Sequence, residues 1–192
     1  MFKTTTSISI TTPVPLTISR AALLAILHDH QEMIKLNPLV VQYQPCSRPP
    51  SPSRRSSSSS QEEAGIGRRT GEDEENERTA GASSGEMEWY RITDEILPYH
   101  FLPFSRVVYT AGFRDAPDGL HTRTYAPMGL RMEGRWTVGP REEAEEGGRL
   151  YLTEEVRMTC SWLTRAFVQR ALKKSHAVLT EKLIEKAAKS DV

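Results

Sequence analysis

Residues 130–138, LRMEGRWTV, alternate between apolar or small side chains and charged or polar ones, which predicts a β-strand with one buried face. Residues 149–160, RLYLTEEVRMTC, show the same alternation. One buried face and one wet face are typical of strands in an antiparallel sheet. The acidic, glycine-rich residues 139–148 between them indicate a turn. The two stretches therefore predict an antiparallel sheet with one face against a core.

Further strands are predicted on both sides of this pair. Residues 115–119, DAPDG, have the composition of a turn that would join two of them. The sheet should contain about six to seven strands. The remaining predicted strands are residues 3–12, 39–44, 88–97, 105–114 and 120–126.

Helices are expected near both ends of the chain. Ser19 is placed to cap a short helix over residues 21–27, and a second short helix over residues 31–35 should end before Pro38. Residues 161–189 predict one long C-terminal helix, about 40 Å in length, enough to cross a small sheet. Its expected apolar stripe consists of Leu163, Phe167, Ala171, Leu172, Val178, Leu179, Leu183 and Ile184. The fold class is therefore α+β.

Residues 46–86 differ in composition from the rest of the chain. They contain one large aliphatic residue, Ile66, no aromatic residue, and many Ser, Gly, Glu and Arg. Such a segment buries too little apolar surface to offset its ordering entropy. We expect a disordered insertion within a single domain that spans residues 1–192. Its Ser51-Pro52 and Arg54-Arg55-Ser56 are candidate phosphorylation sites for a phosphorylation-dependent protein partner.

The overall composition excludes several classes of protein. The 25 Lys and Arg residues balance 25 Asp and Glu, which disfavours a nucleic-acid binder. Two cysteines are too few for a disulfide scaffold or a multi-cysteine zinc module. No apolar run approaches the roughly 18 residues of a membrane-spanning helix, so no integral membrane segment is expected. We expect a cytoplasmic protein with free thiols.

No cofactor or metal is predicted. Gly65-Ile-Gly67 has no strand before it and is therefore no dinucleotide fingerprint. His28 and Glu32 are four residues apart, but the helix should break between them and no third ligand is evident. Nucleophile motifs are also missing from the sequence.

The order of the elements resembles the helix-grip fold of the START and polyketide-cyclase-like (SRPBCC) superfamily. Residues 36–40 (LNPLV), residues 125–129 (YAPMG) and the closing helix are most similar to a family of uncharacterised fungal proteins with this fold. The resemblance implies that the long helix lies over the concave face of the sheet. It also implies a cavity between them that holds a hydrophobic small molecule.

Two interpretations of the interior face remain open. Met and aromatic side chains suit an adaptable apolar pocket, expected to be closed and several hundred Å³ in volume. The same residues would equally make a filled core, because apolar faces are usually packed solid. The candidate lining consists of Tyr109, Phe113, Met132, Trp136, Leu152, Val156, Met158, Leu163 and Phe167.

Two acidic residues fall in phase with the apolar interior. Glu154 and Asp94 would be buried, and a buried carboxyl group has a raised pKa suited to general acid or base catalysis. The alternatives are a bulge that turns them outward or salt bridges with Arg123 or Arg91. Three functions follow: a non-enzymatic carrier of a lipid or polyketide-like molecule, which we favour, a cyclase or dehydratase that uses these carboxylates, or a chaperone-activator-like interaction module with a filled core.

Overall fold

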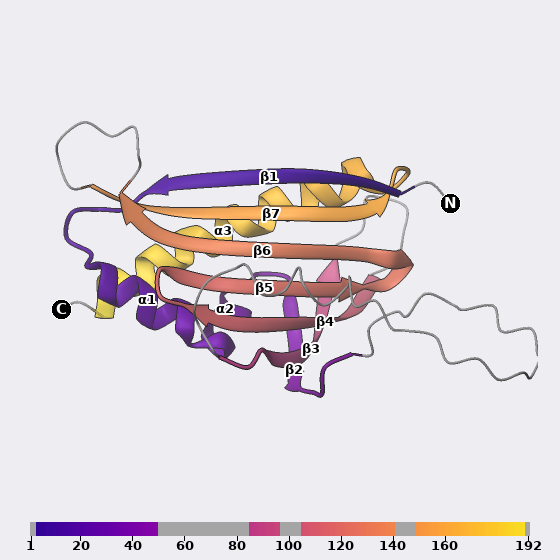
Figure 1. Cartoon of the computed structure of the whole chain (residues 1–192), viewed down its shortest axis with the longest axis horizontal. Coiled ribbons are helices and arrows are strands. Elements are labelled where there is room, and N and C mark those ends of the chain that lie inside the picture. The colour runs from indigo at the N-terminus through magenta and orange to yellow at the C-terminus, as the bar shows by residue number, and fades with distance from the viewer. Residues whose placement is uncertain (1–2, 50–84, 97–104, 141–148, 191–192) are drawn as a thin grey trace, which may run out of the picture.

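The computed structural model describes residues 3–49, 85–96, 105–140 and 149–190. They contain one sheet of seven strands in the order β1-β7-β6-β5-β4-β3-β2, and all neighbouring strands are antiparallel (Figure 1). The first strand therefore pairs with the last. The strands are β1 (Lys3–Pro13), β2 (Val40–Pro45), β3 (Glu88–Ile96), β4 (Ser105–Ala116), β5 (Gly119–Ala126), β6 (Leu130–Pro140) and β7 (Leu150–Ser161).

Three α-helices cover one face of this sheet (Figure 1). The backbone N–H of Ala22 donates to the Ser19 hydroxyl at 3.1 Å, which caps α1 as the sequence predicts. The architecture is the predicted helix-grip arrangement: an antiparallel sheet, two short helices after the first strand, and one long C-terminal helix. The helices are α1 (Arg20–His28), α2 (His30–Leu36), α3 (Arg165–Ser190) and the short 3₁₀ turn η2 (Pro127–Gly129).

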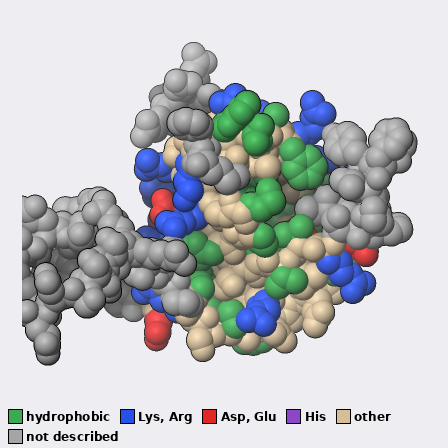
Figure 2. Space-filling model, turned by 90° about the vertical axis from the view of Figure 1, so that its right-hand side faces the viewer, with side chains coloured by type: hydrophobic (Ala, Val, Ile, Leu, Met, Phe, Trp, Pro, Cys, Tyr) green, Lys and Arg blue, Asp and Glu red, His purple; other side chains and the backbone are tan. Residues whose placement is uncertain are grey.

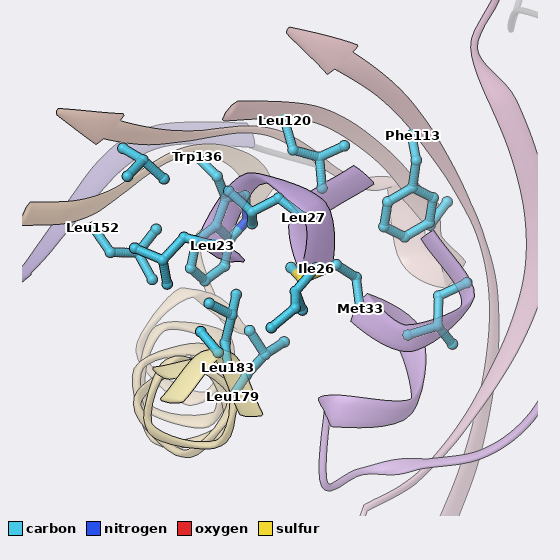
Figure 3. Close-up of a cluster of buried hydrophobic side chains, with 14 of the residues drawn as sticks. Leu23, Ile26, Leu27, Met33, Phe113, Leu120, Trp136, Leu152, Leu179 and Leu183 are labelled. Atoms are coloured by element: carbon cyan, nitrogen blue, oxygen red, sulfur yellow. The ribbon is translucent and has the colours of Figure 1, made fainter. Parts of the chain in front are cut away.

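The core lies between the sheet and the helices (Figure 3). Leu183 of α3 and Leu27 of α1 are fully buried, and Leu120 and Leu152 reach them from the sheet. A smaller cluster forms around Val156, where the first half of α3 crosses β7 and β1. The apolar alternation of β6 and β7 therefore does place one face of each strand in the interior.

The long helix starts later than the sequence analysis expects. Ser161 is still paired with Lys3 in the ladder between β7 and β1, so it belongs to the strand. A turn follows, in which the backbone N–H and the hydroxyl of Thr164 both donate to the Ser161 carbonyl. The helix begins only at Arg165. Leu163 therefore lies in a turn and not on the apolar stripe of the helix.

Several residues singled out from the sequence lie outside the described ranges. Residues 50–84 make up most of the predicted insertion at 46–86, and they include both candidate phosphorylation sites. The disordered insertion stays a prediction. Within the described ranges, no helix is both long enough and apolar enough to cross a membrane.

Candidate functional site

A buried carboxylate and a histidine meet between the sheet and α3. Glu154 is 2% exposed and faces the interior because it alternates with outward-facing side chains of β7. His176 of α3 places its Nδ1 2.5 Å from Glu154 Oε1, and its ring stacks on Trp136 at a centroid distance of 6.3 Å. The strand pairing of β7 with β1 and β6 continues through Glu154, so no bulge turns this residue outward. The hydrogen-bond partner of the Glu154 side chain is His176 and not Arg123.

Sequence reasoning missed His176, although a signal for it exists. His176 follows Leu172 by four residues and precedes Leu179 by three, so it falls on the apolar stripe of α3. A histidine on such a stripe must face the sheet. Finding its partner requires the relative placement of α3 and β7, which the spacing does not contain.

A second acidic group, Asp94, lies near enough to His176 for the two to interact electrostatically. Asp94 of β3 accepts a hydrogen bond from the Tyr109 hydroxyl at 3.0 Å. Burial raises the pKa of Asp94 to about 6, while the Tyr109 hydrogen bond and the nearby His176 act in the opposite direction. Burial, and then the Asp94 carboxyl group, raise the pKa of Tyr109 well above its usual range. Burial therefore makes the protonated form of Asp94 more favourable than it is in an exposed aspartate.

Two adjoining cavities connect these groups. The inner cavity, of about 100 Å³, is lined by Glu154, Trp136 and Val156 among others. The outer cavity, of about 140 Å³, is lined by Asp94 and Phe167 among others. Each alone is smaller than the expected pocket of several hundred Å³. The two share a wall of Asn37, Tyr109, Thr124, Met132, Leu172 and His176.

The structure brings together most, but not all, of the residues singled out from the sequence. Leu152 and Met158 line neither cavity and are packed into the protein, 1% and 0% exposed. Leu163 is expected from the sequence to line the pocket, but it is 69% exposed and lines neither cavity. Those that line a cavity are Tyr109, Phe113, Met132, Trp136, Val156, Phe167, Glu154 and Asp94.

The outer cavity reaches the surface at the end of the molecule where α3 begins. Phe167 lines this cavity and is nevertheless exposed, as are Trp162, Leu163 and Met128. Figure 2 views this end and shows apolar side chains gathered across it, with Lys and Arg side chains around them. Asp94 therefore lines the cavity that reaches this surface, and Glu154 lines the adjoining one.

A histidine on α2 has a different environment. His30 of α2 is 8% exposed, with Nδ1 2.9 Å from Glu88 Oε2 and Nε2 2.9 Å from Asp115 Oδ1. The hydrogen bonds that Glu88 accepts from His30 and Tyr90 lower the pKa of its carboxyl group. Since both ring nitrogens of His30 have partners, we interpret this group as a structural clamp between α2 and the sheet.

A wider hollow of about 800 Å³ lies beside the start of β3. It shares no lining residue with either cavity, and its lining includes exposed charged side chains such as Arg48 and Glu86. The inner and outer cavities, lined by the acid groups Glu154 and Asp94, are therefore the candidate site.

The described residues contain no group of three or more His, Cys, Asp or Glu that could hold a metal ion. His28 lies with its Nε2 3.0 Å from the Gly119 carbonyl oxygen, and Glu32 pairs with Lys35 and Lys186. These two residues are therefore used in contacts between elements.

Asp94→Asn should stabilise the protein at pH 8 by about 2 kcal/mol and by less than about 0.5 kcal/mol at pH 4. The folded pKa of about 6 lies above the usual value of 3.8. The folded state therefore holds a proton that the unfolded chain loses between about pH 4 and 6, and stability falls as the pH rises through this window. Above pH 6 the carboxyl group of Asp94 is ionised, and the free-energy cost of burying its charge is fully present. The neutral amide of Asn does not have this cost. Urea unfolding at both values measures the difference.

Asp118→Asn is the matched control, because Asp118 is exposed and pairs with Arg135 on the surface. It should change stability by less than about 1 kcal/mol at either pH. An equal gain from Asp94→Asn at pH 4 and pH 8 would show that burial of the charge is not the cause.

Comparison with solved structures shows that the fold is shared with other proteins. TTHA0849 from Thermus thermophilus is 13% identical with a TM-score of 0.57, and the alignment covers 97% of this chain and 100% of that protein. The di-domain ARO/CYC StfQ from the steffimycin biosynthetic pathway is 11% identical, with a TM-score of 0.59 and coverage of 97% and 51%. This chain thus spans about half the length of StfQ. Ara h 8.0201 is 12% identical, with a TM-score of 0.52 and coverage of 97% and 99%.

At these identities the likeness shows the fold alone. No curated protein matches the chain in sequence. The model of one protein family, the domain of unknown function DUF7053, matches residues 3–189. Because this match spans almost the whole chain, the protein belongs to the DUF7053 family.

Proposed function

We propose that the protein binds a compact hydrophobic molecule in the inner and outer cavities, between the sheet and α3. The observation that carries this proposal is the pair of adjoining cavities, with walls of Trp136, Phe113 and Met132, the buried Glu154 in one and the half-buried Asp94 in the other. Apolar walls with a few placed polar groups are typical of small-molecule sites. The fold shared with ARO/CYC StfQ adds support, since it places a protein from a biosynthetic pathway on the same architecture.

The volumes favour a ring compound over a long-chain lipid. An apolar cavity of about 150 Å³ is enough to bind one benzene molecule. The inner and outer cavities, about 100 and 140 Å³, are each close to this size. Met132 belongs to their shared wall, and a flexible methionine side chain can move to join them. The joined space would suit a compound of two fused rings.

A larger side chain on the shared wall should weaken binding. Thr124 of β5 lines both cavities, so Thr124→Phe should weaken binding at least tenfold, because the new ring occupies the ligand's space. Native mass spectrometry after incubation with a total metabolite and lipid extract would measure the bound fraction. The expected result for the unmodified protein is a discrete mass increase with one molecule bound.

Val108→Phe provides the control, because Val108 is 49% exposed and lines neither cavity. It should bind as the unmodified protein does. A folded unmodified protein that gains no mass from any extract would contradict the proposed function and favour a filled core with a protein partner.

Acid–base catalysis on the bound molecule is a second candidate function, of the cyclase or dehydratase kind. The Glu154–His176 contact of 2.5 Å and the raised pKa of Asp94, about 6, favour it. The test is the mass and the chromatographic retention time of the recovered ligand, because dehydration removes water whereas a simple ring closure leaves the mass unchanged. A ligand returned with altered mass or retention time by the unmodified protein, and unchanged by Glu154→Gln, supports an enzyme, whereas a ligand unchanged in both respects by both proteins supports a carrier.

A fungal origin, a cytoplasmic location and a phosphorylation-dependent partner that binds through residues 46–86 stay predictions. Ser51 and Ser56 lie outside the described residues.

A further inference from the structure

The second oxygen of Glu154 has no partner among the described residues. Glu154 Oε1 lies beside His176 Nδ1, but Oε2 is fully buried and accepts no hydrogen bond from any described group. A buried acceptor without a donor costs free energy, and native proteins rarely leave one unsatisfied. Because Glu154 lines the inner cavity, a bound molecule can supply the donor.

The chemistry of the pair restricts what that molecule can be. A carboxylate oxygen accepts hydrogen bonds and cannot donate them. Glu154 occupies the Nδ1 of His176, so the ring presents only its Nε2 to a further partner. Among the described residues, no Lys or Arg lines the inner or the outer cavity, and Asp94 adds a second acid group in the outer cavity. A ligand carboxylate would therefore meet like charge in a buried site, which is unfavourable.

The walls beside Glu154 are aromatic. Trp136 lies opposite Glu154 in the ladder between β6 and β7, and Phe113 and Tyr109 line the same cavity. Aromatic side chains favour flat rings by stacking or by edge contacts. The inner cavity thus combines aromatic wall residues with the acceptor oxygens of Glu154.

We propose that the ligand is a neutral, hydroxyl-bearing ring compound that enters hydroxyl-first and donates its O–H to Glu154 Oε2. This inference rests on the proposed function, because it names the ligand class of the same cavities. It excludes fatty acids and other carboxylates as ligands. It also assigns Glu154 a recognition role that does not require turnover.

Three matched probes test the assignment: 2-naphthol, its methyl ether 2-methoxynaphthalene, and 2-naphthoic acid at pH 8. We expect the unmodified protein to bind 2-naphthol at least about tenfold more tightly than the ether, since the ether has no donor for Oε2. The acid, ionised at this pH, should show no measurable binding. Titration calorimetry gives all three dissociation constants.

Glu154→Gln removes the charge at nearly constant shape and should reduce the preference for 2-naphthol over the ether to less than about threefold. It should also allow 2-naphthoic acid to bind. Glu155→Gln is the matched control, since Glu155 is the next residue of β7 and faces outward. This control should keep the tenfold preference.

The outcomes separate this inference from the proposed function. Equal binding of 2-naphthol and its ether by the unmodified protein would overturn the hydroxyl assignment while the apolar site stands. A preference that survives in folded Glu154→Gln would overturn the role of Glu154. If none of the three probes binds, the proposed function itself is contradicted for ring compounds, and this inference falls with it.

Discussion

Leu183→Ala should lower the free energy of unfolding by about 3 kcal/mol, which for a domain of this size corresponds to a melting temperature roughly 6–12 °C lower. Leu183 is completely buried on α3 and belongs to the main core cluster. Figure 3 shows Leu183 and Leu179 pointing from α3 toward α1, which carries Leu23 and Ile26. The alanine would leave a cavity at the contact that holds α3 to the helices and the sheet. Thermal unfolding followed by circular dichroism measures the change.

Leu16→Ala makes the same chemical change at a site that is 80% exposed. It should alter stability by less than about 0.5 kcal/mol. If Leu183→Ala proved as mild as this control, α3 would not be anchored through Leu183. The candidate site would then lose its rigid wall, because His176 lies two helical turns before Leu183 on the same helix.

The strands were predictable because alternation is a local property. The pattern of residues 130–138 predicts which side chains of β6 face inward, and Trp136 and Val138 are indeed buried. The same logic predicts an inward Glu154, which is 2% exposed. The periodicity of α3 similarly identifies Leu172, Leu179 and Leu183, all of them buried.

The site itself was less predictable because its contacts join distant elements. His176 and Glu154 meet only after α3 has been placed against β7, and no local pattern contains that placement. The pairing of Asp94 with Tyr109 likewise depends on the register between β3 and β4. Cavity volume depends on how side chains such as Met132 pack, which residue type alone does not determine.

The start of α3 shows how one local pattern can override another. Leu163 fits the apolar spacing of the helix, yet the ladder between β1 and β7 continues to Ser161 and leaves residues 162–164 to turn the chain. As a result Leu163 is exposed and Phe167 sits at the mouth of the outer cavity. Helix periodicity alone could not predict where the strand would end.

Gly119→Ala should destabilise the protein by about 3 kcal/mol or more, although it adds a single methyl group. Gly119 is the first residue of β5, and a Cβ built there would lie 1.9 Å from the backbone carbonyl oxygen of Trp136. A side chain can rotate away from such a contact, but this oxygen belongs to the neighbouring strand. β5 and β6 must therefore separate, which disturbs the ladder between them. Chemical denaturation measures the loss.

The same substitution should also weaken ligand binding, because the displaced backbone is that of Trp136. The Trp136 ring lines the inner cavity and stacks on His176, so movement of β6 shifts the wall against which the ligand would rest. Gly139→Ala is the matched control: a Cβ there meets no atom of the described residues within 4 Å, and both stability and binding should be nearly unchanged. If Gly119→Ala lost stability but bound 2-naphthol as tightly as Gly139→Ala, the Trp136 wall would not be part of the binding site.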